Sequence, residues 1–346
     1  SFHASSIDNC KNIFNNVTGK DGKQIVYINE LPVNIDNFEG SRLIMCNVNF
    51  SNITNSNFTR QGINAYYSNK NSFSNIIAMG NISRGIYLYD SSNSTFSNVN
   101  GSSNTYDGIC MASFSNNNNF SNVIGSSKTS HGIYLYYSSK NIFSNAIGNS
   151  NNSRGMLIDS SSNNTFSNIT VISNISTALY FSFNSDFNSI INSTLISLNK
   201  NGTLLYFASA SNSNIFYWNN FTETSGYYVQ DLNGANYFNT TINGKSEGNI
   251  WNDVMNGSVN ILGNINSSAY PSLYIGKYGT GYPYKNTTSF GKLSGNVVDY
   301  APLTNLLYID TTPPYFTLIP ENSSLFYGNE SLLVQFTAED ETAFQG

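Results

Sequence analysis

The sequence repeats itself at a nearly constant period through most of its length. An opening glycine returns every 23 or 24 residues, at Gly62, Gly85, Gly108, Gly132 and Gly155. A phenylalanine in a box of the form Phe-Ser-Asn-hydrophobic returns at the same spacing, at Phe73, Phe96, Phe120, Phe143 and Phe166. Self-similarity at a fixed period of roughly 20–50 residues is typical of a solenoid, whose copies stack on one another.

One copy of the repeat predicts short strands joined by polar turns. Residues 86–89 alternate apolar and amphipathic side chains, which is the period of a strand with one buried face. Residues 90–94 and 101–104 are rich in Ser and Asn and predict turns, while residues 95–96 and Val99 predict two more short strands. No helical period is present, and the fixed Leu positions of a leucine-rich repeat are missing. The sequence therefore predicts an all-β parallel β-helix with about 23 residues per turn.

Equivalent residues of successive turns are expected to lie above one another, because stacked strands lie about 4.8 Å apart. The phenylalanines of the box then form an inward ladder, which continues less regularly at Phe14, Phe50, Phe187, Phe216 and Phe238. The bend after each box predicts an asparagine ladder, since Asn tolerates left-handed backbone and can hydrogen-bond its own copies. Its members are Asn75, Asn98, Asn122, Asn145 and Asn168.

The sequence divides into three segments. Their boundaries are the point at which the repeat stops and the point at which two prolines interrupt the chain. Residues 1–250 are predicted to form the β-helix, and residues 251–309, rich in Gly, Tyr and Pro, its C-terminal cap. A cap is needed because the end of a β-helix exposes an unpaired strand edge. Residues 310–346 open with Asp-Thr-Thr-Pro-Pro and predict a linker and the first strands of an Ig-like β-sandwich. Two or three strands are too few for an independent core, so we expect this module to be incomplete.

Composition excludes several classes of protein. Only 10% of the residues are charged and the net charge is −5, so the Lys/Arg footprint of a nucleic-acid-binding protein is missing. No apolar run approaches the roughly 18–20 residues of a transmembrane segment. The odd number of cysteines leaves two alternatives open, a bond between Cys10 and Cys46 or three free thiols. Asn-x-Ser/Thr tripeptides predict glycosylation of a secreted protein, with candidates at Asn52, Asn81, Asn93, Asn168, Asn192, Asn256 and Asn286.

The residue before each repeat glycine belongs to a row of polar side chains, Gln61, Arg84, Asp107, His131 and Arg154. Arg84, Asp107 and His131 are candidate catalytic residues for polysaccharide cleavage, which needs a base or a pair of carboxylates. The alternative is a surface ladder in which unlike charges on neighbouring turns attract each other. We favour the ladder, because the nearby aspartates do not share one repeat position and no carboxylate pair is enforced. The sequence therefore predicts no enzymatic activity.

Tyrosines form a second candidate site on the outer face of the first strand of each turn. By alternation with the inward residues, an aromatic stripe is predicted at Tyr66, Tyr87, Tyr89, Tyr134 and Tyr136. Aromatic rings give a large contact area at low entropy cost, which suits sugar stacking or a protein interface. The alternative is that tyrosine is simply frequent in strands. We favour a role in binding or assembly.

The repeat Gly-Ile-Tyr-Leu-Tyr followed by Ser-Ser-Asn-x-Thr-Phe-Ser-Asn-Val resembles the β-helix repeat of the NosD family, named after a periplasmic copper-binding protein. Residues 27–48 are similar to the opening of that family and residues 249–303 to its closing segment, so the resemblance covers about residues 1–305. It implies a right-handed β-helix, a secreted location, and a multidomain cell-surface protein of the kind expanded in archaea.

Copper is the ligand that the family name suggests, and copper prefers His, Met and Cys ligands. The two His, five Met and three Cys of the chain are scattered. Met111 and Met156 lie at inward strand positions, where core packing explains them better. We therefore expect neither a metal site nor a cofactor.

These observations favour an extracellular structural protein that assembles with copies of itself into a cell-surface layer or filament. The alternative is a carbohydrate-active β-helix enzyme, a lyase or a hydrolase, or an adhesin that binds glycans. The expected partners are the chain itself and, secondarily, cell-surface glycans, but not nucleic acid. A further hypothesis is that a strand from another chain completes the C-terminal module, as in strand addition.

Overall fold

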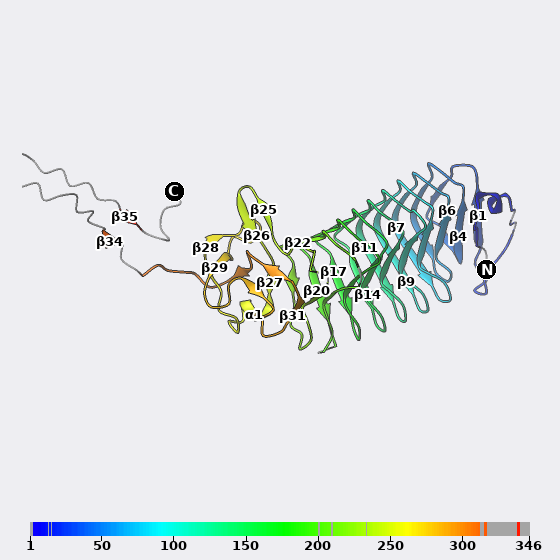
Figure 1. Ribbon diagram of the computed structural model, residues 1–346. Helices are drawn as coiled ribbons and strands as arrows, with labels where there is room; N and C mark the ends of the chain where they lie inside the picture. Colours follow the sequence, from blue (N-terminus) through cyan, green and yellow to red (C-terminus); the bar gives the residue numbers. More distant parts are fainter. Residues whose placement is uncertain are drawn as a thin grey trace, which may run out of the picture.

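The computed structural model describes residues 3–12, 14, 16–199, 201–208, 210–232 and 234–311, together with one short strand pair near the C-terminus. Over these residues the chain winds into a long parallel β-solenoid, with the N-terminus at one end and an irregular cap at the other (Figure 1). Helical structure in the described residues is limited to the 3-10 helix η1 (Ile7–Lys11) and the single turn α1 (Asn252–Met255). The predicted all-β solenoid class is therefore confirmed.

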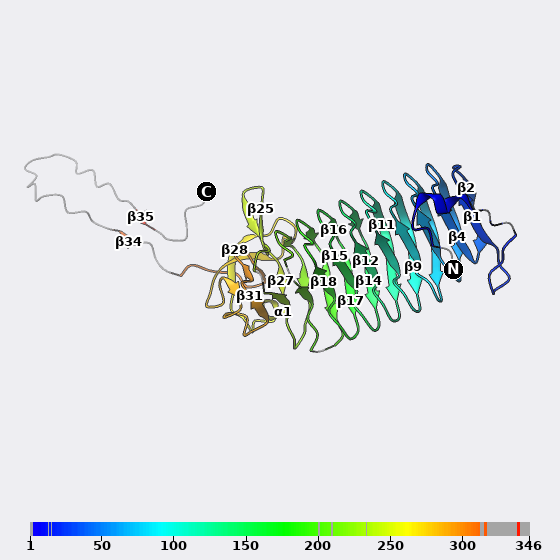
Figure 2. The ribbon, with the colours of Figure 1, turned by 45° about the vertical axis from the view of Figure 1, so that its right-hand side comes forward.

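The first sheet runs the whole length of the rod and takes one strand from each turn (Figure 2). Its strands pair in parallel without a register shift, so that Ile86, Ile109 and Ile133 lie directly above one another. In spatial order the strands are β1 (Ile25–Asn29), β4 (Arg42–Cys46), β6 (Ile63–Tyr66), β8 (Ile86–Tyr89), β10 (Ile109–Ala112), β12 (Ile133–Tyr136), β15 (Met156–Asp159), β18 (Leu179–Ser182), β21 (Leu205–Phe207), β24 (Val229–Asp231) and β31 (Leu293–Gly295).

The remainder of each turn supplies the other walls of the solenoid, also by parallel pairing. The two strands predicted for this part are one continuous strand in β5, β7, β9 and β11, and they are separate in the first turn, as β2 and β3, and again in the later turns. These strands are β2 (Asn34–Asp36), β3 (Glu39–Gly40), β5 (Asn52–Phe58), β7 (Ser72–Gly80), β9 (Thr95–Ser103), β11 (Asn119–Ser127), β13 (Ile142–Ser144), β14 (Ile147–Ser150), β16 (Thr165–Ser167), β17 (Thr170–Ser173), β19 (Ser189–Ile191), β20 (Thr194–Ser197), β22 (Ile215–Tyr217) and β23 (Asn220–Phe221).

Phenylalanines stack face to face inside the solenoid because the turns are in register. The ring centroids of Phe96 lie 4.6 Å from Phe73 and 4.5 Å from Phe120, and the stack continues through Phe143 to Phe166. All five rings are buried. Together with the inward aliphatic residues they form one continuous core along the rod.

Three of the outlying phenylalanines do not belong to this stack. Phe50 and Phe187 are 69% and 62% exposed, and Ile53 and Ile190 pair in register with Phe73 and Phe166 instead. Both exposed rings stand three residues before the core position, at a corner where φ is 59° and 56°. The prediction from spacing was wrong here, because the chain places an isoleucine at the inward position. Phe14 also lies outside the core, against Tyr27.

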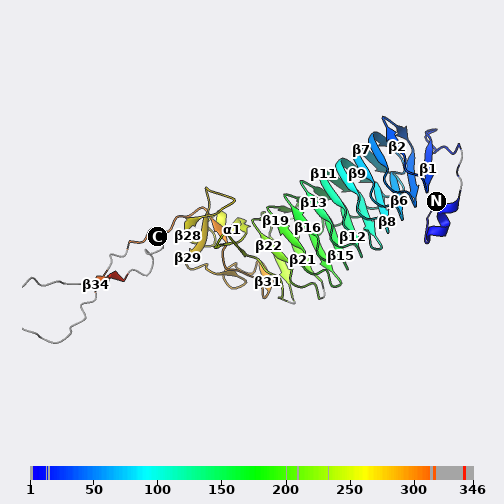
Figure 3. The same cartoon turned by 90° about the horizontal axis from the view of Figure 1, so that it is seen from above.

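The two ends of the rod are covered differently. At the start, η1 lies against the outer face of the first sheet (Figure 3). A disulfide joins Cys10 of η1 to Cys46 of β4. This resolves the two alternatives for these cysteines, and Cys110 remains a buried free thiol. At the other end, residues 240–304 add β25 (Thr240–Ile242), β26 (Lys245–Glu247), β27 (Ile250–Trp251), β28 (Leu262–Asn266), β29 (Tyr274–Tyr278), β30 (Tyr284–Lys285), β32 (Val298–Asp299) and β33 (Leu303–Thr304).

The centre of the C-terminal cap is the indole of Trp251, which is buried. It stacks on Phe221 of the last regular turn with centroids 4.2 Å apart and lies 4.7 Å from Tyr284. Strand β31 from the same segment pairs with β24 and so ends the first sheet. This segment closes the apolar interior that an open solenoid end would expose.

Most of residues 310–346, where the sequence predicts a linker and an Ig-like module, lies outside the described residues. The described part consists of residues 310 and 311 and an antiparallel pair of β34 (Tyr315–Phe316) and β35 (Ala338–Glu339). The hypothesis that another chain completes this module therefore also falls outside them. Among the residues described, no helix is long and apolar enough to cross a membrane.

Candidate functional site

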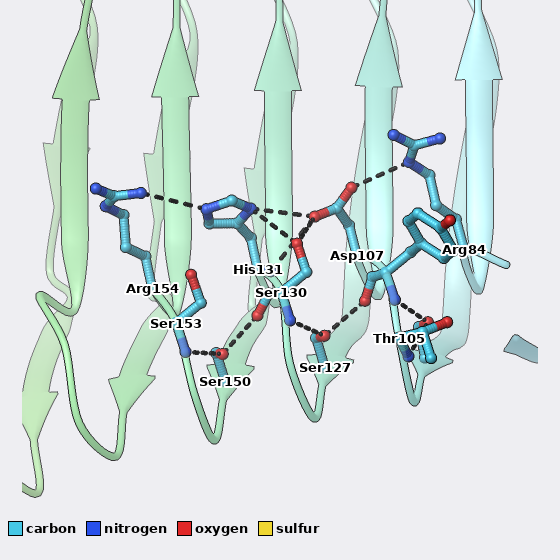
Figure 4. Close-up of polar contacts among 11 residues, drawn as sticks. Arg84, Thr105, Asp107, Ser127, Ser130, His131, Ser150, Ser153 and Arg154 are labelled. Atoms are coloured by element: carbon cyan, nitrogen blue, oxygen red, sulfur yellow. Dashed lines mark hydrogen bonds and ion pairs between the residues drawn. The ribbon is translucent and has the colours of Figure 1, made fainter. Parts of the chain in front are cut away.

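A row of polar side chains runs across successive turns, just before the strands of the first sheet begin (Figure 4). Arg84, Asp107, His131 and Arg154 each precede a repeat glycine, and the stacking of the turns places them side by side. The structure thus brings together the three residues predicted as a candidate active site.

Asp107 is the centre of this row and is buried. Its Oδ2 accepts a hydrogen bond from Nε of Arg84 at 3.0 Å. Its Oδ1 accepts one from the Ser130 hydroxyl at 2.6 Å and lies 3.1 Å from Nδ1 of His131. The backbone N–H of His131 donates to the same oxygen at 3.3 Å. Both carboxylate oxygens are therefore occupied by groups of the chain itself.

The electrostatics keep Asp107 ionised. Burial by itself would raise the pKa of this carboxyl, but the hydrogen bonds from His131 and Ser130 and the charge of Arg84 outweigh it. The net effect lowers the pKa of Asp107 to about 2. A carboxylate held in this way cannot serve as a general acid near neutral pH.

The ends of the row are held by aromatic rings. The guanidinium of Arg84 lies over the ring of Tyr87 at 4.5 Å, and that of Arg154 over Tyr180 at 3.9 Å. Nη1 of Arg154 also lies 3.4 Å from Nε2 of His131. Each member of the row thus contacts a partner on a neighbouring turn, which is the arrangement of a ladder that joins turns.

Serines in the adjacent bends support the same part of the turn. The Ser127 hydroxyl accepts the backbone N–H of Ser130 at 2.9 Å, and the Ser150 hydroxyl accepts that of Ser153 at 2.9 Å. Each hydroxyl also donates a hydrogen bond to a backbone carbonyl of the preceding turn. Ser127 donates to the carbonyl of Tyr106, and Ser150 donates to the carbonyl of Ser130. The backbone of Ser130 is fixed in this way, so its side chain reaches Asp107.

Cys110 is a neighbour of the row that the sequence did not single out. Its side chain is buried on the outer face of β10, where it interacts electrostatically with Asp107 and Arg84. Burial, and secondly the charge of Asp107, raise the pKa of the thiol. A protonated, covered thiol is not a nucleophile, and only the register of β10 reveals that it lies beside Asp107.

The structure differs from the expected open stripe of tyrosines. Tyr66 and Tyr87 are buried in one cluster with Ala4 and Cys10 of the N-terminal segment, which lies on the outside of the sheet. The ring of His3 lies 5.8 Å from that of Tyr66 and 5.7 Å from that of Tyr89. Tyr89 and Tyr134 are half-buried, and Tyr136 is exposed. Sequence alternation identified the outward face but not the segment that covers its first part.

The stripe continues instead at the corner that follows the first sheet, where aromatic side chains are exposed. We call this the aromatic corner, formed by Phe114, Tyr136, Tyr137 and Phe183. The backbone N–H of Phe114 donates to the carbonyl of Tyr137 on the next turn at 2.7 Å. Alongside lies a hollow of about 590 Å³, lined by both tyrosines, Asp159 and Phe183.

The predicted glycosylation sites all lie at the surface. The seven asparagines are exposed, and Asn168 is also a member of the asparagine ladder. The amide oxygen of Asn192 accepts a hydrogen bond from the hydroxyl of Tyr270 in the cap. Exposure leaves each of these sequons open to modification.

The donor sets of the described residues do not fit copper. No three His, Cys, Asp or Glu side chains among them come together as they would around a metal ion. Met111 and Met156 are fully buried in the apolar core. His131 has both ring nitrogens facing partners in the polar row.

Comparison with known proteins identifies the family. The family model described as periplasmic copper-binding protein (NosD) matches residues 6–256. No curated protein and no solved structure gives a significant match. Because the matched residues make up well over half of the chain, it belongs to the NosD family, and this membership indicates an extracellular or periplasmic protein.

Proposed function

We propose that this chain is an extracellular structural protein, a rod that associates with other copies of itself into a cell-surface layer or filament. The observation that carries this proposal is the aromatic corner. Phe114 and Phe183 are 64% and 63% exposed, although large aromatic side chains usually lie in a core or an interface. The rest of the chain offers little charge to keep copies apart, since only 10% of its residues are charged.

A second copy is the partner that fits this corner best. The aromatic residues lie on the turns of β10, β12 and β18, at multiples of the spacing between stacked turns, which is about 4.8 Å, and Ser160 stands at the corner of the turn between β12 and β18. Another copy of the rod has the same spacing, so two rods laid lengthwise can bring the aromatic residues of these three turns together. Several weak contacts along a rigid rod together give a higher affinity than each contact alone, so no single deep pocket is needed.

Self-association is tested with the double variant Phe114→Asp and Phe183→Asp. Both positions have φ values in the left-handed region, 65° and 45°, where Asp is well tolerated, so the fold is preserved. We expect the variant to sediment as a monomer and to form no filaments or sheets in electron microscopy, because like charges now face each other.

The matched control is Phe50→Asp with Phe187→Asp, which places the same change on exposed phenylalanines at another corner, with φ of 59° and 56°. This control is expected to associate like the wild type. A wild-type chain that stays monomeric at high concentration, or a control that dissociates equally, would contradict the proposal.

We propose further that the polar row joins neighbouring turns and does not catalyse a reaction. Its single carboxylate, Asp107, is occupied by Arg84, Ser130 and His131, whereas β-helix hydrolysis uses two carboxylates about 5–9.5 Å apart. The family name refers to copper binding, but since the described residues offer no fitting donor set, copper is not part of this proposal.

The variant Asp107→Asn distinguishes a structural from a catalytic row. We expect it to lower the free energy of unfolding by about 2 kcal/mol, because it removes one partner of a buried ion pair. Asp8→Asn, at the exposed Lys11–Asp8 pair, should leave stability unchanged. The wild type should release no products from acidic polysaccharides, and turnover that disappears in Asp107→Asn or Arg84→Ala would refute the structural role.

A further inference from the structure

A polar groove crosses five successive turns and includes none of the residues of the polar row or the aromatic corner, although Ser127, which supports the bend before His131, lines it. Its volume is about 580 Å³. One side is a column of in-register residues on β7, β9, β11 and β14, namely Met79, Ser102, Ser126 and Asn149. Four steps of about 4.8 Å make the groove roughly 19 Å long, the shape of a site for an extended chain.

The lining offers hydroxyl and amide groups rather than rings or carboxylates. Asn81, Asn104 and Asn151 line the other side, and Nδ2 of Asn104 donates to Oδ1 of Asn81 at 2.8 Å. Among the described residues that line it, none is aromatic or acidic. Neighbouring strands already use the backbone groups of this sheet in parallel pairing, so a peptide could not bind by adding a strand.

Two cations give the groove its charge. Arg60 lies at its first turn and Lys128 at its fourth. Within the described residues, Nε of Arg60 and Oδ1 of Asn149 are buried atoms that have no hydrogen-bond partner. Buried polar atoms normally have partners, so both ends of the groove hold unused hydrogen-bonding capacity.

We infer that this groove binds an extended acidic oligosaccharide. Sugar hydroxyls match the Ser and Asn side chains, and the acidic groups match Arg60 and Lys128, which carry charges of the opposite sign. The exposed side chain of Met79 offers an apolar surface to the face of a sugar ring. A single-stranded nucleic acid is a poorer fit, because its bases stack on aromatic side chains and the groove has none.

The test measures binding of a fluorescent hexamer of galacturonic acid, with a neutral cello-oligosaccharide of equal length as the comparison. The protein is made in a host without N-glycosylation, because Asn81 is a predicted glycan acceptor at the groove. We expect the acidic hexamer alone to bind, and to bind more weakly as salt increases. Arg60→Gln and Lys128→Gln should each weaken binding about tenfold, since each removes one charge-assisted hydrogen bond.

Lys140→Gln is the matched control, since it removes the same charge from an exposed lysine that does not line the groove. It should bind like the wild type. The Phe114→Asp, Phe183→Asp variant should also keep its affinity, so failure of the assembly proposal does not affect this one. Absence of binding, equal binding of the neutral chain, or unchanged affinity in both groove variants would overturn the inference.

Discussion

At the scale of single residues, asparagine has two different roles in this chain. At the bend of each turn, Asn75, Asn98 and Asn122 have φ of 55°, 54° and 54°, a region that costs other L-residues roughly 1–2 kcal/mol. Their amides donate to one another across turns at 3.1 and 3.2 Å. A second set of asparagines is buried and includes Asn141 and Asn164, which lie on successive turns. The side-chain oxygen of each accepts a hydrogen bond from a backbone N–H of the preceding turn at 2.8 Å.

Two aspartates in the cap make stability depend on pH. Burial raises the pKa of Asp299 to about 7, although Asn249, Ala301 and Trp251 donate hydrogen bonds to it, and burial raises the pKa of Asp253 to about 6. The ordinary value is about 3.9, so the folded chain binds these protons more tightly than the unfolded chain. Their contribution to stability is present below about pH 4 and is lost as pH rises through 6 to 7.

We therefore expect the cap to melt at a lower temperature at pH 8 than at pH 5, as followed by the fluorescence of buried Trp251. Asp107 does not oppose this trend, because its pKa is lowered and its contribution is lost only as pH falls from about 4 towards 2. Asp299→Asn should flatten the dependence. A melting temperature that rises between pH 5 and pH 8 would show that burial does not raise the pKa values of Asp299 and Asp253 in the folded chain.

At the scale of elements, the stability of the rod comes from strands that repeat the same side chain at the same place. The parallel strands pair without register shifts through the regular turns, so each inward residue contacts its equivalents above and below. The turn at Phe120 is the clearest case, since its ring has a stacked neighbour on either side at 4.5 Å. A defect in one element should therefore affect both of its neighbours.

Phe120→Ala should lower the free energy of unfolding by about 3–5 kcal/mol, because it leaves a cavity between two rigid turns. Phe187→Ala, at an exposed ring of the same type, should change it by less than about 0.5 kcal/mol. Both values come from denaturant titration followed by circular dichroism. Similar losses in the two variants would mean that the stack is not the source of stability.

At the scale of the whole molecule, the N-terminal segment and the cap decide which surfaces remain open. The disulfide between Cys10 and Cys46 joins η1 to β4 over a sequence separation of 36 residues, and the carbonyl of Cys10 accepts hydrogen bonds from Tyr27 and Asn29. This segment packs in one buried cluster with Tyr66 and Tyr87, whereas Phe114 and Phe183 stay exposed among the described residues.

The double variant Cys10→Ser and Cys46→Ser is expected to leave the solenoid folded and to free the N-terminal segment. Residues 3–11 should then become susceptible to protease, and Tyr66 should become accessible to chemical modification of tyrosine. Cys110→Ser, which leaves the disulfide in place, is the comparison. Loss of the whole β-sheet signal in the double variant would instead mean that the disulfide supports the rod itself.

The sequence by itself determined the solenoid, its period and the stacked residues Phe96 and Asn98, because a repeat in phase forces equivalent residues into contact. It could not decide which outward residues stay exposed, since that depends on contacts between distant segments. The burial of Tyr66 by residues 3–11, the pairing of Cys10 with Cys46, and the place of Cys110 beside Asp107 all arise in this way. Only the tertiary structure sets the environment of a side chain, and hence its charge and its availability to a partner.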